Sequence, residues 1–148
     1  MIAPAVWALN PGNTAGWETL RELRNQCREF MTGSTAWITA SQQEDFRKNL
    51  EDSTQKVYLV VEGVCSIAFL YLRLDCATGE WIPTYGVAEA KRGLGYGKFL
   101  VALSQVLCER LRLKVLQTND RACQLYHALG FVVTTQQNGV KEMYWERP

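Results

Sequence analysis

Apolar residues along the chain recur with two different periods, and these periods divide the chain into helices and strands. Trp17, Leu20, Leu23, Cys27 and Phe30 are three or four residues apart, which is the spacing of an amphipathic helix. Shorter apolar runs that are separated by turn residues are typical of strands. They predict strands over residues 6–9, 57–62, 64–74, 80–87, 113–117, 131–135 and 142–145.

Further helices are predicted between these strands. Ser41 and Glu44 have the spacing of a capping box, so a second helix is expected to begin near Ser41. A fourth helix over 120–129 is expected to end at Gly130. The apolar face of the third helix is expected to contain Phe99, Leu103, Val106, Leu107 and Leu111. The predicted order is βααβββαβαββ, and because it contains no repeat or linker, residues 1–148 are expected to form a single domain.

Two local signals refine the predicted strands. Pro83 interrupts the strand over 80–87, and a proline in a strand is typical of an edge, an end or a bulge because it has no backbone N–H to donate. Asn138 and Gly139 form a dipeptide that favours two-residue hairpins. The last two strands are therefore expected to pair around them.

The run from 91 to 98, Lys-Arg-Gly-Leu-Gly-Tyr-Gly-Lys, is the strongest candidate for a binding site. Glycine lets backbone N–H groups approach a ligand without a Cβ in the way. A helix that begins in this run adds unpaired N–H donors and a partial positive charge at its first turn. The run therefore predicts a site for a phosphate or pyrophosphate group.

Two familiar phosphate motifs do not fit this spacing. A dinucleotide motif needs G-x-G-x-x-G, but the glycine after Gly95 comes one residue early, at Gly97. A P-loop needs glycine where Arg92 stands and a serine or threonine where Phe99 stands. A turn between a strand and a helix that binds no ligand is the remaining alternative, because glycine-rich turns are common.

A second segment downstream decides between these readings. Arg92-x-x-Gly95-x-Gly97 resembles the pyrophosphate loop of the GNAT superfamily of acetyl-CoA-dependent N-acetyltransferases. Residues 119–131, Asn-Asp-Arg-Ala-Cys-Gln-Leu-Tyr-His-Ala-Leu-Gly-Phe, are similar to the same family's N-x-x-A-x-x-L-Y-x-x-x-G-F motif. The two motifs occur in the order and separation that the family shows. Ala90 stands where relatives often have proline, which leaves the glycine spacing intact.

The resemblance implies an α/β fold of the GNAT type: a mixed, mostly antiparallel sheet with helices on both faces and a splay between the fourth and fifth strands. It also implies acetyl-CoA as co-substrate, bound where the strands separate. In that arrangement the N–H of Val87 faces the thioester carbonyl, and Asn119 binds the pantetheine arm or caps the following helix. The residues that the resemblance assigns to the cofactor site are Val87, Arg92, Gly93, Leu94, Gly95, Tyr96, Gly97, Lys98, Asn119 and Tyr126.

The resemblance further implies that Tyr126 is the general acid that protonates the departing thiolate. Packing in the core is the alternative, because Tyr126 shares a helical face with other apolar residues. The general base is left open among Glu80, Tyr85, Asp75 and a chain of water molecules, with a solvent-exposed charge as the alternative for Glu80. No cysteine has the neighbours of a nucleophile, so direct transfer in a ternary complex is expected.

Composition narrows the possible partners and surroundings. With 16 basic and 15 acidic residues, the net charge of +1 gives no general affinity for nucleic acid or membranes. Five cysteines form no C-x-x-C pair and no metal-finger spacing with the single His127, so reduced thiols and no metal are expected. The amino terminus lacks the pattern of a signal peptide. A cytoplasmic protein is therefore expected.

The leading hypothesis is an N-acetyltransferase that moves an acetyl group from acetyl-CoA to a primary amine. The acceptor is a small molecule or a peptide of unidentified structure, another acyl group is a variant of the same hypothesis, and a homodimer is compatible with the family. The first alternative is a non-catalytic acyl-CoA-binding module. The second is an interaction protein whose glycine loop binds nothing.

Overall fold

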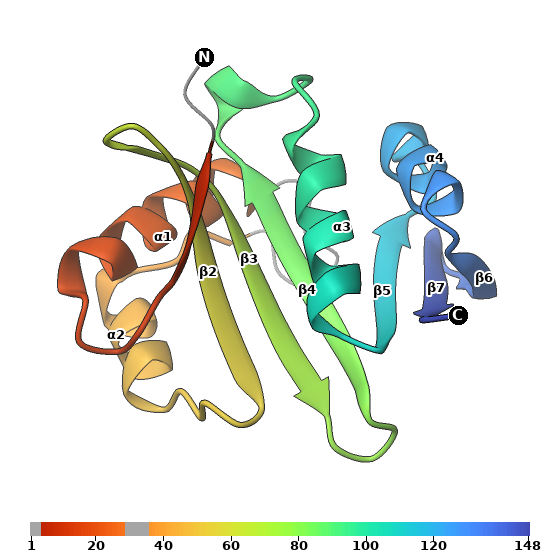
Figure 1. Ribbon diagram of the computed structural model, residues 1–148, viewed down its shortest axis with the longest axis horizontal. Helices are drawn as coiled ribbons and strands as arrows, with labels where there is room; N and C mark the ends of the chain where they lie inside the picture. Colours follow the sequence, from red (N-terminus) through yellow and green to blue (C-terminus); the bar gives the residue numbers. More distant parts are fainter. Residues whose placement is uncertain (1–3, 29–35) are drawn as a thin grey trace.

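Seven strands form one continuous sheet in the computed structural model, which describes residues 4–28 and 36–148 (Figure 1). The strand order is β1-β2-β3-β4-β5-β7-β6. Every pair of neighbours is antiparallel except β4 and β5, which are parallel. The strands are β1 Ala5–Ala8, β2 Gln55–Glu62, β3 Cys65–Asp75, β4 Glu80–Val87, β5 Arg110–Leu116, β6 Val132–Gln137 and β7 Val140–Glu146.

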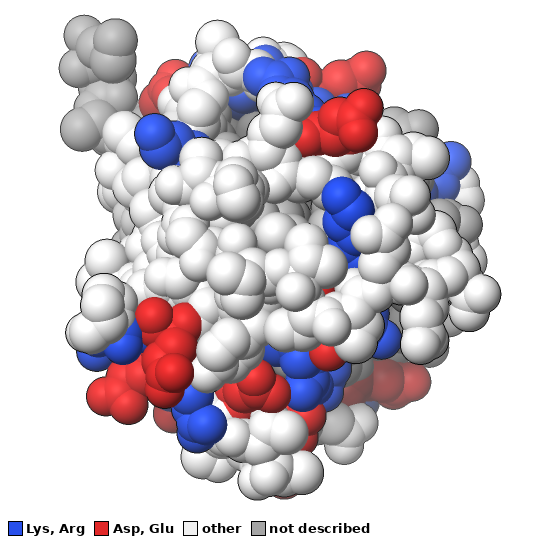
Figure 2. All heavy atoms as spheres, turned by 90° about the vertical axis from the view of Figure 1, so that its right-hand side faces the viewer, with Lys and Arg blue, Asp and Glu red and all other residues white. Residues whose placement is uncertain are grey.

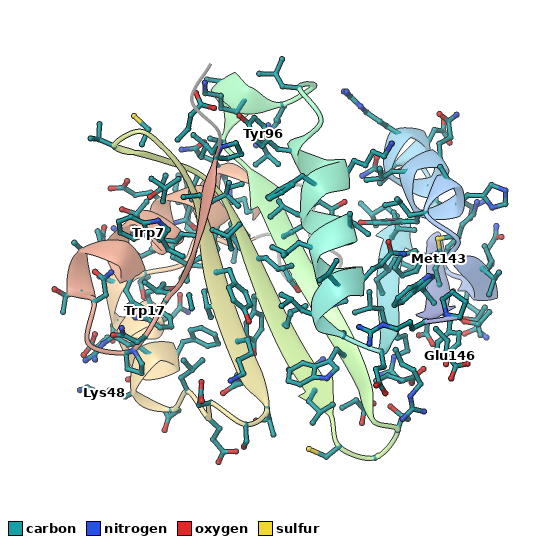
Figure 3. All side chains as sticks on the ribbon, in the orientation of Figure 1. Trp7, Trp17, Lys48, Tyr96, Met143 and Glu146 are labelled. Atoms are coloured by element: carbon teal, nitrogen blue, oxygen red, sulfur yellow. The ribbon has the colours of Figure 1, made fainter. Side chains whose placement is uncertain are left out.

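Helices cover both faces of this sheet, as predicted. The helices are α1 Thr14–Gln26, α2 Ala40–Lys48, α3 Tyr96–Leu107 and α4 Asp120–Ala128, with a short 3-10 turn at Glu89–Lys91. On one face, α1 buries Trp17 (labelled in Figure 3), Leu20 and Leu23 against Leu59 and Phe69 of the sheet, and Phe46 of α2 packs against the same cluster. On the other face, a separate core lies between the sheet, α3 and α4. The predicted mixed α/β fold is therefore confirmed.

The second and third helices differ in detail from the predictions. The capping box of α2 lies two residues earlier than expected, because the Thr39 hydroxyl accepts from the Gln42 N–H and the Gln42 side chain accepts from the Thr39 N–H. Glu44, which was expected to cap, instead pairs with Arg47.

The buried face of α3 consists of Leu100, Val101 and Ser104, whereas Phe99, Val106 and Leu107 of the predicted face are exposed. The helix is apolar nearly all round, so periodicity alone did not select a face. Ser104 tolerates complete burial because its hydroxyl donates to the Leu100 carbonyl. Leu111 does not extend the helix; it is a fully buried residue of β5.

The splay between β4 and β5 is confirmed, and Pro83 explains it. Trp81 and Leu111 form the register pair between these strands in the described chain. From there the strands separate toward their carboxyl-terminal ends (Figure 1). Pro83 is two residues beyond Trp81, on the same side of β4, and has no N–H to donate. The missing donor removes one hydrogen bond from the ladder at this point, and β4 is an edge on this side beyond it, as the proline predicted.

Candidate active site

A cavity of about 1050 Å³ fills the space where β4 and β5 separate. Its walls are residues 83–87 of β4 and 113–115 of β5, and the glycine-rich loop lies at one end. Residues of α4 line the cavity from one face of the sheet, and residues of α1, α2 and 36–38 line it from the other. The cavity therefore passes through the sheet, so that two ligands can meet from opposite faces.

The glycine-rich loop lines this cavity at the start of α3. Gly93 and Gly95 have φ angles of 80° and 94°, which side-chain-bearing residues rarely adopt. Gly95 is also the N-cap of α3, where no side chain caps the helix and no acidic residue occupies the first turn. Gly97 lines the cavity with an ordinary φ, and an added Cβ would make only normal contacts there, 3.8 Å from Leu125 and Tyr85. These features fit an anion at the start of α3.

Ion pairs and hydrogen bonds hold the loop in place from both sides. The Glu62 carboxylate at the end of β2 accepts from Lys91 Nζ (3.1 Å) and from the Tyr96 hydroxyl (2.5 Å) (Figure 3). The side chain of Arg92 donates to the carbonyls of Val87 (3.1 Å) and Gln26 (2.9 Å). Arg92 thus ties the loop to the ends of β4 and α1. Leu94, which was assigned to the cofactor site, has a 66% exposed side chain and can contribute only its backbone.

Two further cations border the loop, Lys98 and Arg121. Both line the cavity, and neither makes an ion pair within the described residues. Arg121 extends from α4 to within 3.5 Å of the position that a Cβ on Gly93 would take. Lys98 was part of the sequence prediction, whereas Arg121 was not, because only the packing of α4 brings it beside the loop.

The edge of β4 offers backbone groups to the cavity at every second residue. The Ala88 N–H donates to the Ile67 carbonyl of β3 (2.8 Å). In an antiparallel ladder, residues whose N–H and C=O groups bond to the neighbouring strand alternate with residues whose N–H and C=O groups point away from that strand. Val87 and Tyr85 occupy the outward positions, so their N–H groups point from β3 toward the splay. This register is compatible with the predicted role of the Val87 N–H, which stays a prediction.

Tyr126 lies on α4 with its ring in the core and its hydroxyl in the cavity. The ring is only 6% exposed, and its oxygen is 2.7 Å from the hydroxyl of Tyr85 on β4. Burial raises the pKa of Tyr126 well above its ordinary value, and the nearby Tyr85 raises it further. Burial also raises the pKa of Tyr85. Both hydroxyls therefore stay protonated at neutral pH and form one hydrogen-bonded pair in the cavity wall.

Asn119 positions Tyr126 by capping α4. Its side-chain oxygen accepts from the Ala122 N–H (3.2 Å), which is the capping arrangement that the sequence suggested. Asn119 also lines the cavity, and no described residue accepts from its side-chain NH₂ group. The cap thus leaves the amide donor available to a ligand.

Glu80 lies apart from the other predicted site residues. Its carboxylate accepts from Arg112 (2.9 Å), which also donates to Asp75 (2.7 Å), at the end of the sheet where β4 and β5 are still paired. Neither carboxylate lines the cavity. Of the side chains considered as a base, only Tyr85 reaches the cavity, and its raised pKa makes it a poor proton acceptor at neutral pH.

Sequence reasoning did not identify the residues that shape the α1 side of the cavity. Gly86 allows α1 to pack directly on β4, since an added Cβ would lie 2.5 Å from Cys27 Sγ. Buried Asn25 donates to the Ile38 carbonyl (3.1 Å) and accepts from the Ile38 N–H (2.7 Å), so it fixes Ile38 at the cavity wall. An isolated glycine in a strand can signal such a close approach, but no local signal pointed to Asn25.

The glycine loop at a helix start and the parallel strand pair that splays are features that the resemblance to GNAT acetyltransferases implies. The chain belongs to the acetyltransferase (GNAT) family, whose model matches residues 17–131. A comparison with curated proteins by sequence finds no significant match. Among the described residues, no helix is long and apolar enough to cross a membrane, and no three potential metal ligands of the His, Cys, Asp or Glu type lie together.

Solved structures share the fold at low sequence identity. A GNAT-family acetyltransferase from Streptococcus pneumoniae superposes with a TM-score of 0.77 at 17% identity, covering 97% of this chain and 99% of that chain. Spermidine N-acetyltransferase from Vibrio cholerae, solved with CoA and spermine, gives 0.78 at 19% identity, covering 97% and 95%. A Salmonella typhimurium protein solved with its cofactor acetyl-CoA gives 0.76 at 13% identity, covering 97% and 94%.

Proposed function

We propose that this protein is an N-acetyltransferase that transfers an acetyl group from acetyl-CoA directly to a primary amine. The observation that carries the proposal is the cavity at the splay. It joins anion-binding N–H groups at the start of α3, the outward N–H groups of β4 and the Tyr85–Tyr126 hydroxyl pair in one space. Because the cavity is open to both faces of the sheet, the amine can approach without displacing the co-substrate.

The residues present fit coenzyme A. Backbone N–H groups of residues 92–98 would hold the diphosphate, and Lys98 and Arg121 would supply positive charge beside it. The outward N–H groups of Tyr85 and Val87 and the amide of Asn119 would hold the pantetheine arm. Acetyl-CoA supplies the acetyl group as an activated thioester. The Val87 N–H would donate to its carbonyl oxygen, and one such donor is typically worth about 2.7–4 kcal/mol to the transition state.

Tyr126 would serve as the general acid. Each hydroxyl of the pair has one hydrogen. If Tyr85 donates to Tyr126, the Tyr126 hydrogen is free to point into the cavity toward the departing sulfur. The high pKa of Tyr126 keeps the acid protonated until the thiolate accepts its proton.

The acceptor amine would lose its proton to water. Among the described residues that line the cavity there is no carboxylate and no histidine. An amine with a pKa near 10.4 is mostly protonated at neutral pH, so the reactive neutral form would be a minor species. Glu80, paired with Arg112 away from the cavity, is not included in the proposed mechanism.

Calorimetry and a mass-spectrometric acetylation assay test this function together. We expect the protein to bind acetyl-CoA and to produce an acetylated amine and free CoA from a panel of small amines and peptides. Initial rates at varied concentrations of both substrates should give intersecting double-reciprocal lines, as direct transfer requires; parallel lines would indicate an acyl-enzyme. Binding of acetyl-CoA without turnover of any amine would support the acyl-CoA-binding module instead.

A further inference from the structure

We propose that the acceptor amine also carries a carboxylate, and that Arg24 of α1 binds this carboxylate. The inference rests on the proposed function, because it concerns the second substrate of the same cavity. It selects a class of acceptor, such as an amino acid, over polyamines and other purely cationic amines. The evidence is the charge of the cavity wall and the contacts of Arg24.

All charged side chains that line the cavity in the described part of the chain are basic. They are Arg24, Lys91, Arg92, Lys98, Lys114 and Arg121, and no aspartate or glutamate joins them. This charge does not continue over the neighbouring surface. On the face of α4, β6 and β7, acidic and basic side chains occur together above and below a broad uncharged area (Figure 2). A polyamine would bring several positive charges into a cavity that has no described negative group to receive them.

Arg24 differs from the other five cations in its position. Lys91 pairs with Glu62, and Arg92 donates to the carbonyls of Val87 and Gln26. Lys98 and Arg121 border the glycine loop, where a diphosphate would account for their charge, and Lys114 is on β5. Arg24 extends from α1 on the opposite face of the sheet. There the cavity is lined by Phe46, Ile38 and Thr84 rather than by the loop. A cation at that end would meet the acceptor and not the co-substrate.

The contacts of Arg24 leave its charge without a counter-ion. Its Nη1 donates to the Gln43 side-chain oxygen (2.8 Å), and the guanidinium lies over the Phe46 ring, 5.4 Å from its centre. Buried Gln43 is itself fixed, because its amide donates to the Trp17 carbonyl (3.0 Å). No described carboxylate forms an ion pair with Arg24. Burial lowers the pKa of Arg24.

A carboxylate is the ligand that suits such a group. The guanidinium has five N–H donors in a planar fork, and among the described residues only the Gln43 side chain accepts a hydrogen bond from it. A carboxylate accepts two parallel hydrogen bonds from that fork and supplies the missing negative charge. With its carboxylate on Arg24, an amino-acid-like acceptor would have its amine free to approach the splay through the sheet.

Matched amines test this proposal on the wild-type protein. The panel contains the L-α-amino acids, β-alanine and 4-aminobutyrate, each beside its uncharged amide, together with spermidine. We expect acetylated products to come from the carboxylates, with kcat/KM at least tenfold above the matching amides and above spermidine. Amides or spermidine acetylated as fast as the carboxylates would overturn the proposal. The proposal would also be overturned if the protein binds acetyl-CoA but neither acetylates nor binds any carboxylate of the panel.

Substitution of Arg24 tests the assigned residue. Arg24→Gln should weaken calorimetric binding of the preferred carboxylate to the CoA-loaded protein at least tenfold, while CoA affinity stays within twofold. Arg24→Lys keeps the positive charge but loses the planar set of N–H donors, so its affinity for the carboxylate should lie between those of the wild type and Arg24→Gln. Arg73→Gln, at an exposed position outside the cavity, removes one positive charge as a control and should behave as wild type. If Arg24→Gln binds the carboxylate as tightly as the wild type does, Arg24 is not the carboxylate-binding residue. If the wild-type protein does not bind CoA at all, the proposed function itself is refuted.

Discussion

At the scale of single residues, the two tyrosine hydroxyls in the cavity wall are the most specific chemical feature. Tyr126→Phe removes the proposed acid and keeps the ring packed against Phe131. We expect kcat to fall about 10²- to 10⁴-fold, the usual contribution of a general acid, with little change in CoA affinity. Steady-state kinetics and calorimetry measure both. A loss of less than about threefold would leave Tyr126 with a packing role only.

The raised pKa of Tyr126 also predicts the dependence of the reaction on pH. The acid is active when protonated, and burial keeps it protonated to a higher pH than an ordinary tyrosine, whose pKa is near 10. The amine, in contrast, becomes reactive as it loses its proton. We therefore expect kcat/KM for the acceptor to rise from pH 6 to about pH 10 without a descending limb. A decline between pH 7 and 9 would show that another group is the acid.

Gly95 offers a test of the loop that separates binding from folding. Gly95→Ala places a Cβ on a residue with φ of 94°, and Gly63→Ala does the same at φ of 63° in a turn outside the cavity. Neither Cβ would meet another atom within 4 Å, so each should cost about 1–2 kcal/mol of backbone strain. Only Gly95→Ala should weaken CoA binding, by about tenfold or more. Thermal unfolding and calorimetry on both variants make the comparison; equal CoA affinity would exclude the loop as the diphosphate site.

At the scale of elements, the start of α4 combines a structural and a binding role in Asn119. Asn119→Ala removes the cap and should cost about 1 kcal/mol of stability. Asn119→Asp keeps the capping oxygen but loses the NH₂ group, so its free energy of unfolding should stay near wild type. If the NH₂ group binds pantetheine, CoA affinity should fall several-fold in both variants. Denaturant unfolding and calorimetry separate the two effects, and full affinity in Asn119→Asp would limit Asn119 to capping.

Local sequence signals predicted the elements whose geometry is local. Asn138 and Gly139 adopt φ angles of 53° and 77° and close the β6–β7 hairpin, and Gly130 ends α4 with φ of 92°. The cap of α2 was assigned to Ser41-x-x-Glu44, but Thr39-x-x-Gln42 satisfies the same pattern and forms the cap in the folded protein. There Glu44 pairs with Arg47 instead.

Features that depend on contacts between distant elements were not predictable in the same way. Tyr85 and Tyr126 were both considered from the sequence, but their 2.7 Å contact joins residues 41 positions apart. The first two helices, which contain Arg24, were expected to border the acceptor site, but the sequence did not show which of their residues would line the cavity. Glu80 and Arg112 meet because β4 and β5 are parallel at their amino-terminal ends, and this pairing requires the tertiary fold.

At the scale of the whole molecule, the splay leaves the two parts of the sheet joined by little backbone pairing. A ligand that contacts β4, β5, α3 and α4 together should therefore stabilise the folded state as a unit. Acetyl-CoA at 100 times its dissociation constant should add about 2.7 kcal/mol. For a chain of this length that corresponds to a rise in Tm of about 5–10 °C. Differential scanning fluorimetry can measure the shift, and adenosine alone, as the control, should produce almost none.

Pro83 has a kinetic consequence as well as a structural one. Since β4 has no register pair with β5 beyond Trp81, the outward backbone donors of Tyr85 and Val87 have no strand partner on that side before any ligand arrives. A ligand can therefore bind without first breaking hydrogen bonds between β4 and β5, so its association rate does not depend on a conformational opening. A single imino acid in the middle of a strand thus keeps the gap permanently accessible.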